Sequence, residues 1–147
     1  MTDQITSRRR FLAATSLAAG APFVSRLSWA EGSPMQKLQY AAIGLGGRGM
    51  YDVQSISRHE KVRMVAGADV ESATAKKLAD RMDEVKTFSD WREMFETMGK
   101  KIDLVSVSTP DHMHGIMAMS AMNLGKHVYV QKPLAQTIGE CRAMQET

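Results

Sequence analysis

The amino-acid sequence predicts an α/β protein built on a doubly wound parallel sheet. Two observations support this prediction. Short runs of almost only apolar residues recur along the chain, and the segments between them have helical spacing and helix-capping residues. Such apolar runs are typical of strands that are buried on both faces. Strands that alternate with helices form right-handed βαβ units, which assemble into a parallel sheet with helices on both sides.

Five segments have the composition of buried strands: Leu38–Ile43, Val62–Ala68, Val85–Phe88, Ile102–Ser108 and His127–Val130. A glycine or a polar residue stands at the end of each run or directly after it, as is common where a strand gives way to a turn. Ligands of doubly wound sheets bind beyond the carboxyl ends of the strands. The residues that directly follow these runs are therefore candidate site residues.

Five further segments are predicted to be helices from their capping residues and apolar spacing. The first helix opens in glycines 44–49 and runs to about Ser57, and the second runs from a cap at Ser72 to about Met82. The third follows a capping box of Asp90 and Glu93 and ends at Met98 before Gly99. The fourth spans Met113–Leu124 before Gly125, and the last is capped by Thr137 and Glu140.

The first thirty residues have the order of an export signal. Arg8, Arg9 and Arg10 stand directly before an apolar run that continues to Val24, and small residues follow at Ser28 and Ala30. This order predicts a twin-arginine signal peptide over residues 1–30, cleaved after Ala30 and read by the twin-arginine export machinery. We expect a periplasmic protein, with residues 31–37 as a flexible lead-in. The apolar run is too short and interrupted to predict a stable membrane anchor.

The charge of the chain is concentrated in the predicted leader. The whole chain has 19 Lys and Arg against 16 Asp and Glu, but removing the leader's four arginines and one aspartate leaves 15 of each. A neutral remainder without a basic and aromatic stripe gives no support for nucleic-acid binding. The single cysteine, Cys141, has no partner in the chain for a disulfide and is interpreted as a small apolar residue on a helix.

A glycine-rich turn joins the first predicted strand to the first predicted helix, with the sequence Gly44-Leu45-Gly46-Gly47-Arg48-Gly49. In this G-x-G-x-x-G pattern the first glycine permits a tight turn, the second lets the backbone approach a pyrophosphate, and the third lets helix and strand pack closely. The helix N-terminus then favours the anion. All six residues are predicted to bind a dinucleotide.

Asp69 lies 20 residues beyond Gly49, at the end of the second predicted strand. A carboxylate at this place can accept hydrogen bonds from the hydroxyls of an adenosine ribose. Its charge would repel a 2′-phosphate, so the sequence favours NAD. Lys76 and Lys77 nearby leave NADP open as the alternative.

The loop after the fourth predicted strand carries hydroxyl groups and two imidazoles. Ser108, Thr109, Pro110 and His112 are expected to face the cofactor, and His114 is a candidate catalytic residue. An alternative use of this loop is a copper site in which both histidines act together with the sulfurs of Met113, Met117, Met119 and Met122. Methionines at helical spacing more commonly fill a core, so no metal is assigned.

Gln131, Lys132 and Pro133 follow the last predicted strand. A rigid proline can hold the lysine toward the crevice, where Lys132 could donate to a substrate oxygen and take part in proton transfer. The simpler interpretation is a solvated lysine at a strand end. The glycine-rich turn favours the functional interpretation, so all three residues are assigned to the cofactor site and Lys132 also to catalysis.

Together these motifs resemble the family of glucose-fructose oxidoreductase, inositol dehydrogenase and MocA. Gly44–Gly49 and Asp69 are similar to its dinucleotide loop and ribose-binding acid, and Thr109–His114 to its T-P-x-x-x-H loop. Residues 125–128, Gly-Lys-His-Val, lead into Lys132-Pro133 and are similar to its G-K-H-V and E-K-P signature. Gln131 stands where the family usually has glutamate.

The resemblance implies a nicotinamide-dependent oxidoreductase acting on a small sugar, polyol or related carbohydrate, with Lys132 near the nicotinamide. It also implies that most of the substrate surface and the oligomer contacts of the full-length protein lie in a C-terminal α/β domain that this chain lacks. We therefore expect the chain alone to be inactive. Two alternatives are a glycosidase that oxidises its sugar transiently without net consumption of NAD, and a fragment that binds dinucleotide without catalysis.

Overall fold

The computed structural model describes residues 37–147, so the predicted signal peptide and most of the predicted lead-in lie outside the described residues. Within them, five parallel strands form one sheet in the order β3-β2-β1-β4-β5. The strands are β1 (Leu38–Ile43), β2 (Val62–Ala68), β3 (Lys86–Phe88), β4 (Leu104–Val107) and β5 (His127–Val130). This arrangement confirms the predicted doubly wound α/β fold.

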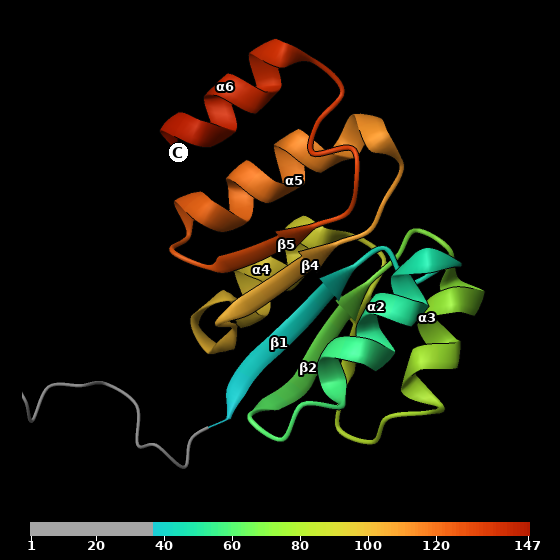
Figure 1. Cartoon of the computed structure of the whole chain (residues 1–147). Coiled ribbons are helices and arrows are strands. Elements are labelled where there is room, and N and C mark those ends of the chain that lie inside the picture. Colours follow the sequence, from blue (N-terminus) through green and yellow to red (C-terminus); the bar gives the residue numbers. More distant parts are fainter. Residues whose placement is uncertain (1–36) are drawn as a thin grey trace, which may run out of the picture. The chain divides into compact units, whose positions relative to one another are not determined.

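Helices cover both faces of the sheet (Figure 1). They are α2 (Arg48–Ser57), α3 (Ser72–Ala79), α4 (Trp91–Met98) and α5 (Asp111–Asn123), with a short 3-10 turn η1 (Gly99–Lys101) after α4. The last helix, α6 (Ile138–Glu146), packs against α5. One core cluster lies under α2 and α3 and includes Tyr40, Val53 and Leu78. The other lies under α4 and α5 and includes Ile43 and Met94. The central strand β1 contributes alternate side chains to the two clusters. Its sequence is nearly continuously apolar because both of its faces are buried.

The order of the strands determines where a ligand-binding crevice lies in the sheet. The chain leaves β3 at one edge and returns at β4 on the other side of β1, and β1 pairs with both β2 and β4. The helices that follow β1 and β4 therefore cover opposite faces, and a crevice opens between the carboxyl ends of these two strands. The glycine-rich turn and the loop beginning at Ser108 both stand at this crevice.

Some predicted helix ends were wrong. Ser72 is the first residue of α3 and Glu71 is its N-cap, without a side-chain capping bond, and the helix ends at Ala79. Asp90 caps α4 by accepting from the Arg92 N–H, so the predicted reciprocal box with Glu93 does not form. The capping box of Thr137 and Glu140 on α6 is confirmed.

Other elements also begin at different residues than predicted: β4 begins at Leu104 instead of Ile102, and α5 begins earlier. Pro110 is the N-cap of α5, which begins at Asp111, two residues before the predicted start. A proline just before a helix is favourable because it has no N–H that needs a partner there. The predicted end of the helix at Met98 before Gly99 is confirmed, and the 3-10 turn η1 then follows through Lys101.

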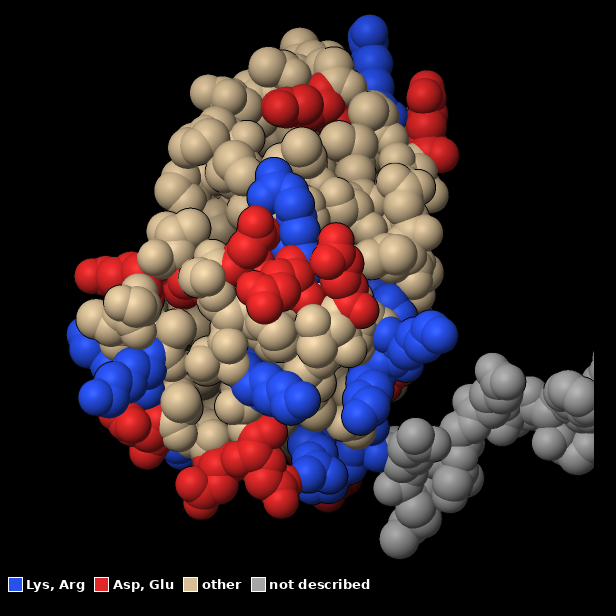
Figure 2. Space-filling model, turned by 180° about the vertical axis from the view of Figure 1, so that it is seen from behind, with Lys and Arg blue, Asp and Glu red and all other residues tan. Residues whose placement is uncertain are grey.

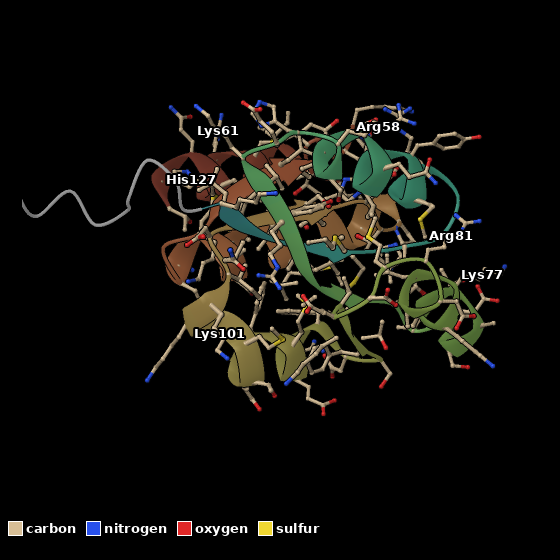
Figure 3. The ribbon with its side chains drawn as sticks, turned by 90° about the horizontal axis from the view of Figure 1, so that it is seen from below. Arg58, Lys61, Lys77, Arg81, Lys101 and His127 are labelled. Atoms are coloured by element: carbon tan, nitrogen blue, oxygen red, sulfur yellow. The ribbon has the colours of Figure 1, made fainter. Side chains whose placement is uncertain are left out.

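Charges on the described residues are intermixed. Figure 2 shows acidic and basic side chains side by side on one face, and Figure 3 shows six labelled basic side chains spread around the rim. Arg63 pairs with Glu84, and Arg48 with Asp52. None of the helices within residues 37–147 combines the length and the apolar character needed to cross a bilayer.

Candidate functional site

The glycine-rich turn is held tightly at both of its ends. Gly44 has φ 85°, and a Cβ built on it would stand 2.5 Å from the carbonyl oxygen of Ser108. A Cβ on Gly49 would overlap the carbonyl oxygen of Gly44. The left-handed conformation at Gly44 and the close approach at Gly49 both exclude a side chain. The turn therefore brings the start of α2 directly against the ends of β1 and β4.

The middle of the turn is open. A Cβ on Gly46 or Gly47 would meet no atom within 4 Å, and both residues are exposed at the N-terminal end of α2. The first N–H groups of a helix lack partners within the helix and favour an anion. A pyrophosphate fits this arrangement because its oxygens can approach the backbone where a side chain would otherwise stand.

Asp69 links the end of β2 to the glycine-rich turn. One carboxylate oxygen accepts from the Leu45 N–H at 2.7 Å, and the other accepts from the Glu71 N–H at 2.9 Å. Each oxygen keeps a further lone pair for a hydroxyl donor. The geometry therefore fits a ribose-binding carboxylate that also fixes the turn. The side chain of Leu45 is buried in the core, so only its backbone can contribute to a site.

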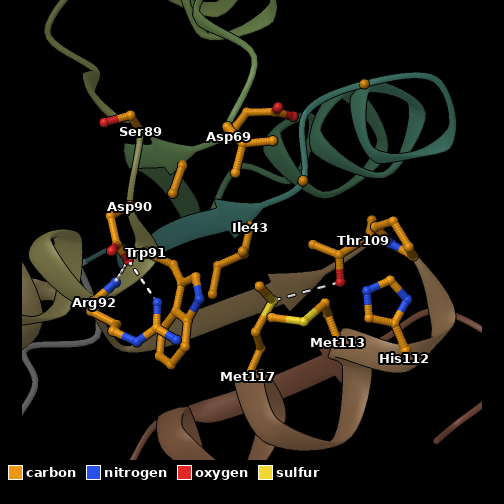
Figure 4. Close-up of a pocket in the computed structure, with 16 residues that line it drawn as sticks. Ile43, Asp69, Ser89, Asp90, Trp91, Arg92, Thr109, His112, Met113 and Met117 are labelled. Carbon is orange, nitrogen blue, oxygen red and sulfur yellow. Dashed lines mark hydrogen bonds and ion pairs between the residues drawn. The ribbon is translucent and has the colours of Figure 1, made fainter. Parts of the chain in front are cut away.

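A pocket of about 570 Å³ lies between these segments, as Figure 4 shows. Trp91 lines one side of it and Thr109 and His112 line the other. Among the predicted site residues it brings together Gly44, Gly46, Asp69, Ser108, Thr109, Pro110 and His112. Lys76 and Asp69 both line a second hollow, so a positive charge stands near the predicted ribose-binding acid.

The predicted site residues that follow β5 do not line this pocket. Gln131 is half-buried, and Lys132 and Pro133 are exposed. The Gln131 amide instead donates to Asp52 on α2 at 2.8 Å, and the Ser108 hydroxyl donates to the same carboxylate oxygen at 2.8 Å. The segment after β5 is therefore hydrogen-bonded to α2, the helix that follows the glycine-rich turn.

His114 is enclosed by backbone. Its side chain is buried, with Nδ1 2.6 Å from the carbonyl oxygen of Pro133 and Nε2 2.8 Å from that of Thr109. Both ring nitrogens face acceptors, and neither faces the pocket. This geometry suits a residue that holds two loops together, whereas the catalytic role of His114 stays a prediction. His112 is exposed and lines the pocket.

Sequence reasoning missed three residues around the site. Trp91 and Arg92 line the pocket, with the guanidinium carbon 4.5 Å from the centre of the Trp91 ring. They follow β3, which pairs with β2, so the strand-end rule would have selected them once the strand order was known. Asp52 is buried although it is charged. Its sequence signal is an acidic residue directly before Val53 on the core-facing side of α2.

A second buried polar group lies beneath the crevice. The hydroxyls of Tyr40 and Ser106 are 2.6 Å apart, and both residues are buried. Burial, aided by the nearby charge of Asp52, raises the pKa of Tyr40 from 10.0 to about 12 although the bond to Ser106 lowers it. Ionisation of this hydroxyl is therefore harder in the folded than in the unfolded chain.

This shift predicts an alkaline weakness of the fold. Because the folded pKa of Tyr40 lies above the unfolded one, its contribution to stability is complete below about pH 10 and is lost as the pH rises toward 12. Tyr40→Phe should cost about 1 kcal/mol at pH 8, where Ser106 loses its partner. It should then lose less stability than the wild type between about pH 9 and pH 11. Urea unfolding of both chains at these pH values measures this, and equal losses would contradict it.

Comparisons with known proteins agree with this geometry. The sequence model of the oxidoreductase family with an NAD-binding Rossmann fold, GFO_IDH_MocA, matches residues 38–147. A glycosyl hydrolase family 109 protein of Solibacter usitatus (strain Ellin6076) is 34% identical over 152 aligned positions, covering 92% of this chain and 35% of that protein. The chain thus spans about a third of the length of this curated relative, and about a quarter of others.

Solved structures show the same relationship. An NAD-binding oxidoreductase from Klebsiella pneumoniae matches with a TM-score of 0.66 and 30% identity, over 75% of this chain and 31% of that one. Myo-inositol 2-dehydrogenase from Lactobacillus plantarum matches with a TM-score of 0.70 and 26% identity, over 76% and 32%. With its NAD-binding Rossmann fold, the chain belongs to the GFO_IDH_MocA oxidoreductase family.

Proposed function

We propose that this chain is the dinucleotide-binding part of an exported oxidoreductase that moves a hydride between nicotinamide and a hydroxyl-bearing carbon of a sugar, polyol or related carbohydrate. The observation that carries the proposal is the open space beside Gly46 and Gly47 at the start of α2. Asp69, at the end of the adjoining strand β2, supports it because its carboxylate can still accept from ribose hydroxyls.

The roles of the residues follow from their positions. When bound, the nicotinamide dinucleotide supplies the hydride donor or acceptor. The backbone at Gly46 and Gly47 holds the pyrophosphate, and Asp69 orients the adenosine ribose. Lys132 is exposed directly after β5, so its ammonium group is free to donate to a substrate oxygen or to hold a proton there. The substrate class is supported by similarity to myo-inositol 2-dehydrogenase.

A second candidate function is favoured by the names of several curated relatives. The curated protein that is 34% identical is named as a glycosyl hydrolase of family 109. On this alternative the same dinucleotide site oxidises a sugar transiently, and the glycosidic bond is cleaved without net consumption of NAD. Both candidates need the same residues of this chain, and they differ in the product that accumulates.

Cofactor binding is tested by filling the open space beside Gly46 with a methyl group. Gly46→Ala adds a methyl group that meets no protein atom, so we expect an unchanged melting temperature but a loss of about tenfold or more in NADH affinity. Fluorescence titration of the 147-residue chain with NADH measures the affinity. Nucleotide released by denaturing the wild-type chain identifies the cofactor. An unchanged affinity in Gly46→Ala, or a wild type that binds no dinucleotide, would refute the proposal.

The reaction is tested on the protein in its natural length. Addition of sugars and polyols should generate reduced cofactor at 340 nm if the protein is a dehydrogenase. Release of an aglycone from glycosides without a change at 340 nm would instead establish the glycosidase. Lys132→Met should lower kcat for whichever reaction is found by about 100-fold, since positioned proton transfer typically contributes that much. Dinucleotide binding without either reaction would support a non-catalytic binding fragment.

Export is the remaining part of the proposal and rests on the sequence of residues 1–30. Replacing both Arg8 and Arg9 by lysine keeps the charge and removes the twin arginine. We expect the variant to stay in the cytoplasm uncleaved, whereas the wild type reaches the periplasm. Cell fractionation with immunodetection measures this, and equal export of both would contradict the signal.

A further inference from the structure

Asp52 is a buried carboxylate directly behind the glycine-rich turn. It lies on α2 three residues after Gly49 and is 5% exposed. Its Oδ2 accepts from the Ser108 hydroxyl and from Nε2 of Gln131, each at 2.8 Å, and its Oδ1 lies 3.3 Å from Nε of Arg48. A buried charge is tolerated only when it is paired and hydrogen-bonded in this way.

The donors to Asp52 come from three parts of the crevice. Arg48, within the glycine-rich motif, is the first residue of α2, the helix that also carries Asp52, whereas Ser108 directly follows β4 and Gln131 directly follows β5. One carboxylate therefore connects the turn that would hold the pyrophosphate to the segment that carries Lys132. A single buried group that joins three elements acts on all of their positions at once.

The amide of Gln131 has one orientation that satisfies its neighbours. A carboxylate can only accept, so the nitrogen of the amide must face Asp52. The oxygen then faces the backbone N–H of Lys132 at 3.3 Å. The Tyr129 hydroxyl lies 3.3 Å from the same amide nitrogen. The Gln131 side chain thus bridges the Asp52 carboxylate and the main-chain N–H of Lys132, so a shift of Asp52 would displace the main chain there.

A glutamate at position 131 would not fit this arrangement. It would place a carboxylate oxygen where the amide nitrogen now stands, against Oδ2 of Asp52, and two facing carboxylates cannot both ionise without a large cost. The glutamine that departs from the expected E-K-P signature is therefore matched to the acid at position 52. Aspartate and glutamine are a complementary pair, whereas aspartate and glutamate are not.

We propose that Asp52 and Gln131 form a positioning pair that sets the main chain at Lys132 relative to the glycine-rich turn, and that Gln131 is required at its position by Asp52. This inference rests on the proposed function, because it presumes that the turn binds a dinucleotide. It assigns no chemistry to either residue. Their contribution is geometric and should appear in dinucleotide affinity.

The charged and titratable groups around the pair are few among the described residues. Arg48 faces Asp52 from its own helix, Tyr40 from β1, and Tyr129 from β5, while Lys132 follows Gln131 in the exposed loop. Arginine, lysine and tyrosine side chains ordinarily keep their charge state between about pH 5.5 and 8. A pH dependence that appears in this range in Gln131→Glu therefore reports the two facing carboxyls.

The test is a double-mutant cycle on the 147-residue chain with Gln131→Glu, Asp52→Asn and the double variant. NADH affinity is measured by fluorescence titration at about pH 8 and about pH 5.5, and melting temperature at both. We expect Gln131→Glu to lose about tenfold in affinity at pH 8 and to recover at pH 5.5, where one proton is shared by the pair. The double variant, which restores an acid and an amide with exchanged places, should bind within about threefold of wild type.

Gln145→Glu is the matched control, because it makes the same charge change at an exposed position on α6. It should leave affinity and melting temperature unchanged at both pH values. The proposal is overturned if Gln131→Glu binds NADH like the wild type at pH 8, or if Asp52→Asn does not rescue it. Coupling seen only in the melting temperature would show a purely structural contact and also overturn the positioning role.

The outcomes separate this inference from the proposed function. If the wild-type chain binds no NADH, the proposed function fails and the positioning role fails with it, and the melting temperatures still show whether the pair is coupled. If the wild type binds NADH and the cycle shows no coupling, only the positioning pair is refuted.

Discussion

Gly49→Ala should lower the free energy of unfolding by about 3 kcal/mol or more, at the upper end of the usual cost of core overpacking. The added Cβ would overlap the carbonyl oxygen of Gly44, would stand 2.8 Å from its carbonyl carbon, and would lie 3.3 Å from Cβ of Ser108. Relief requires α2 to move away from the ends of β1 and β4. Urea unfolding followed by circular dichroism measures the change.

Gly99→Ala is the control for this prediction. Gly99 has φ −52°, an ordinary helical value, and a Cβ built there would meet no atom within 4 Å. The substitution should be neutral or raise stability by a few tenths of a kcal/mol, because alanine loses less backbone entropy on folding. A similar loss of stability at both positions would mean that the close approach of α2 to the turn is not what excludes alanine at 49.

His114→Ala should cost about 3 kcal/mol and should do so in the absence of any ligand. The substitution opens a cavity at a site that is 1% exposed, and it removes the ring whose two nitrogens lie against the carbonyl oxygens of Pro133 and Thr109, one of which accepts its N–H. Thermal and urea unfolding of the chain measure the loss.

His112→Ala is the matched comparison for this prediction. His112 is exposed two residues earlier, in the first turn of the same helix α5, so its removal should change stability by less than about 0.5 kcal/mol. If His114→Ala instead leaves stability intact and lowers only the turnover of the natural-length protein, then His114 acts in proton transfer and our positional interpretation is wrong.

Much of the fold could be predicted because its signals are local. Leu38–Ile43 and Val62–Ala68 are apolar on both faces, since β1 and β2 lie inside the sheet, and their bounds matched the prediction. Helix ends were less predictable. At Asp90 the preceding chain allows the carboxylate to reach the Arg92 N–H, and sequence spacing does not contain that geometry.

The site could be predicted in part for the same reason. Gly44 and Asp69 carry a local pattern and a fixed spacing, and the structure places both on one pocket. Asp52 and Trp91 required knowledge of the strand order and of packing across the sheet. The partner of Gln131 lies 79 residues away on α2, and no local pattern identifies such a contact.

Because Asp69 accepts a hydrogen bond from the Leu45 N–H, its proposed role in cofactor preference is coupled to the conformation of the glycine-rich turn. The carboxylate that we propose as the ribose-selecting group also holds the turn against the end of β2. A lineage that exchanged this acid to accept a phosphorylated ribose would release the Leu45 N–H at the same moment. A change of selectivity at this position would therefore also loosen the turn unless a new acceptor replaced the carboxylate.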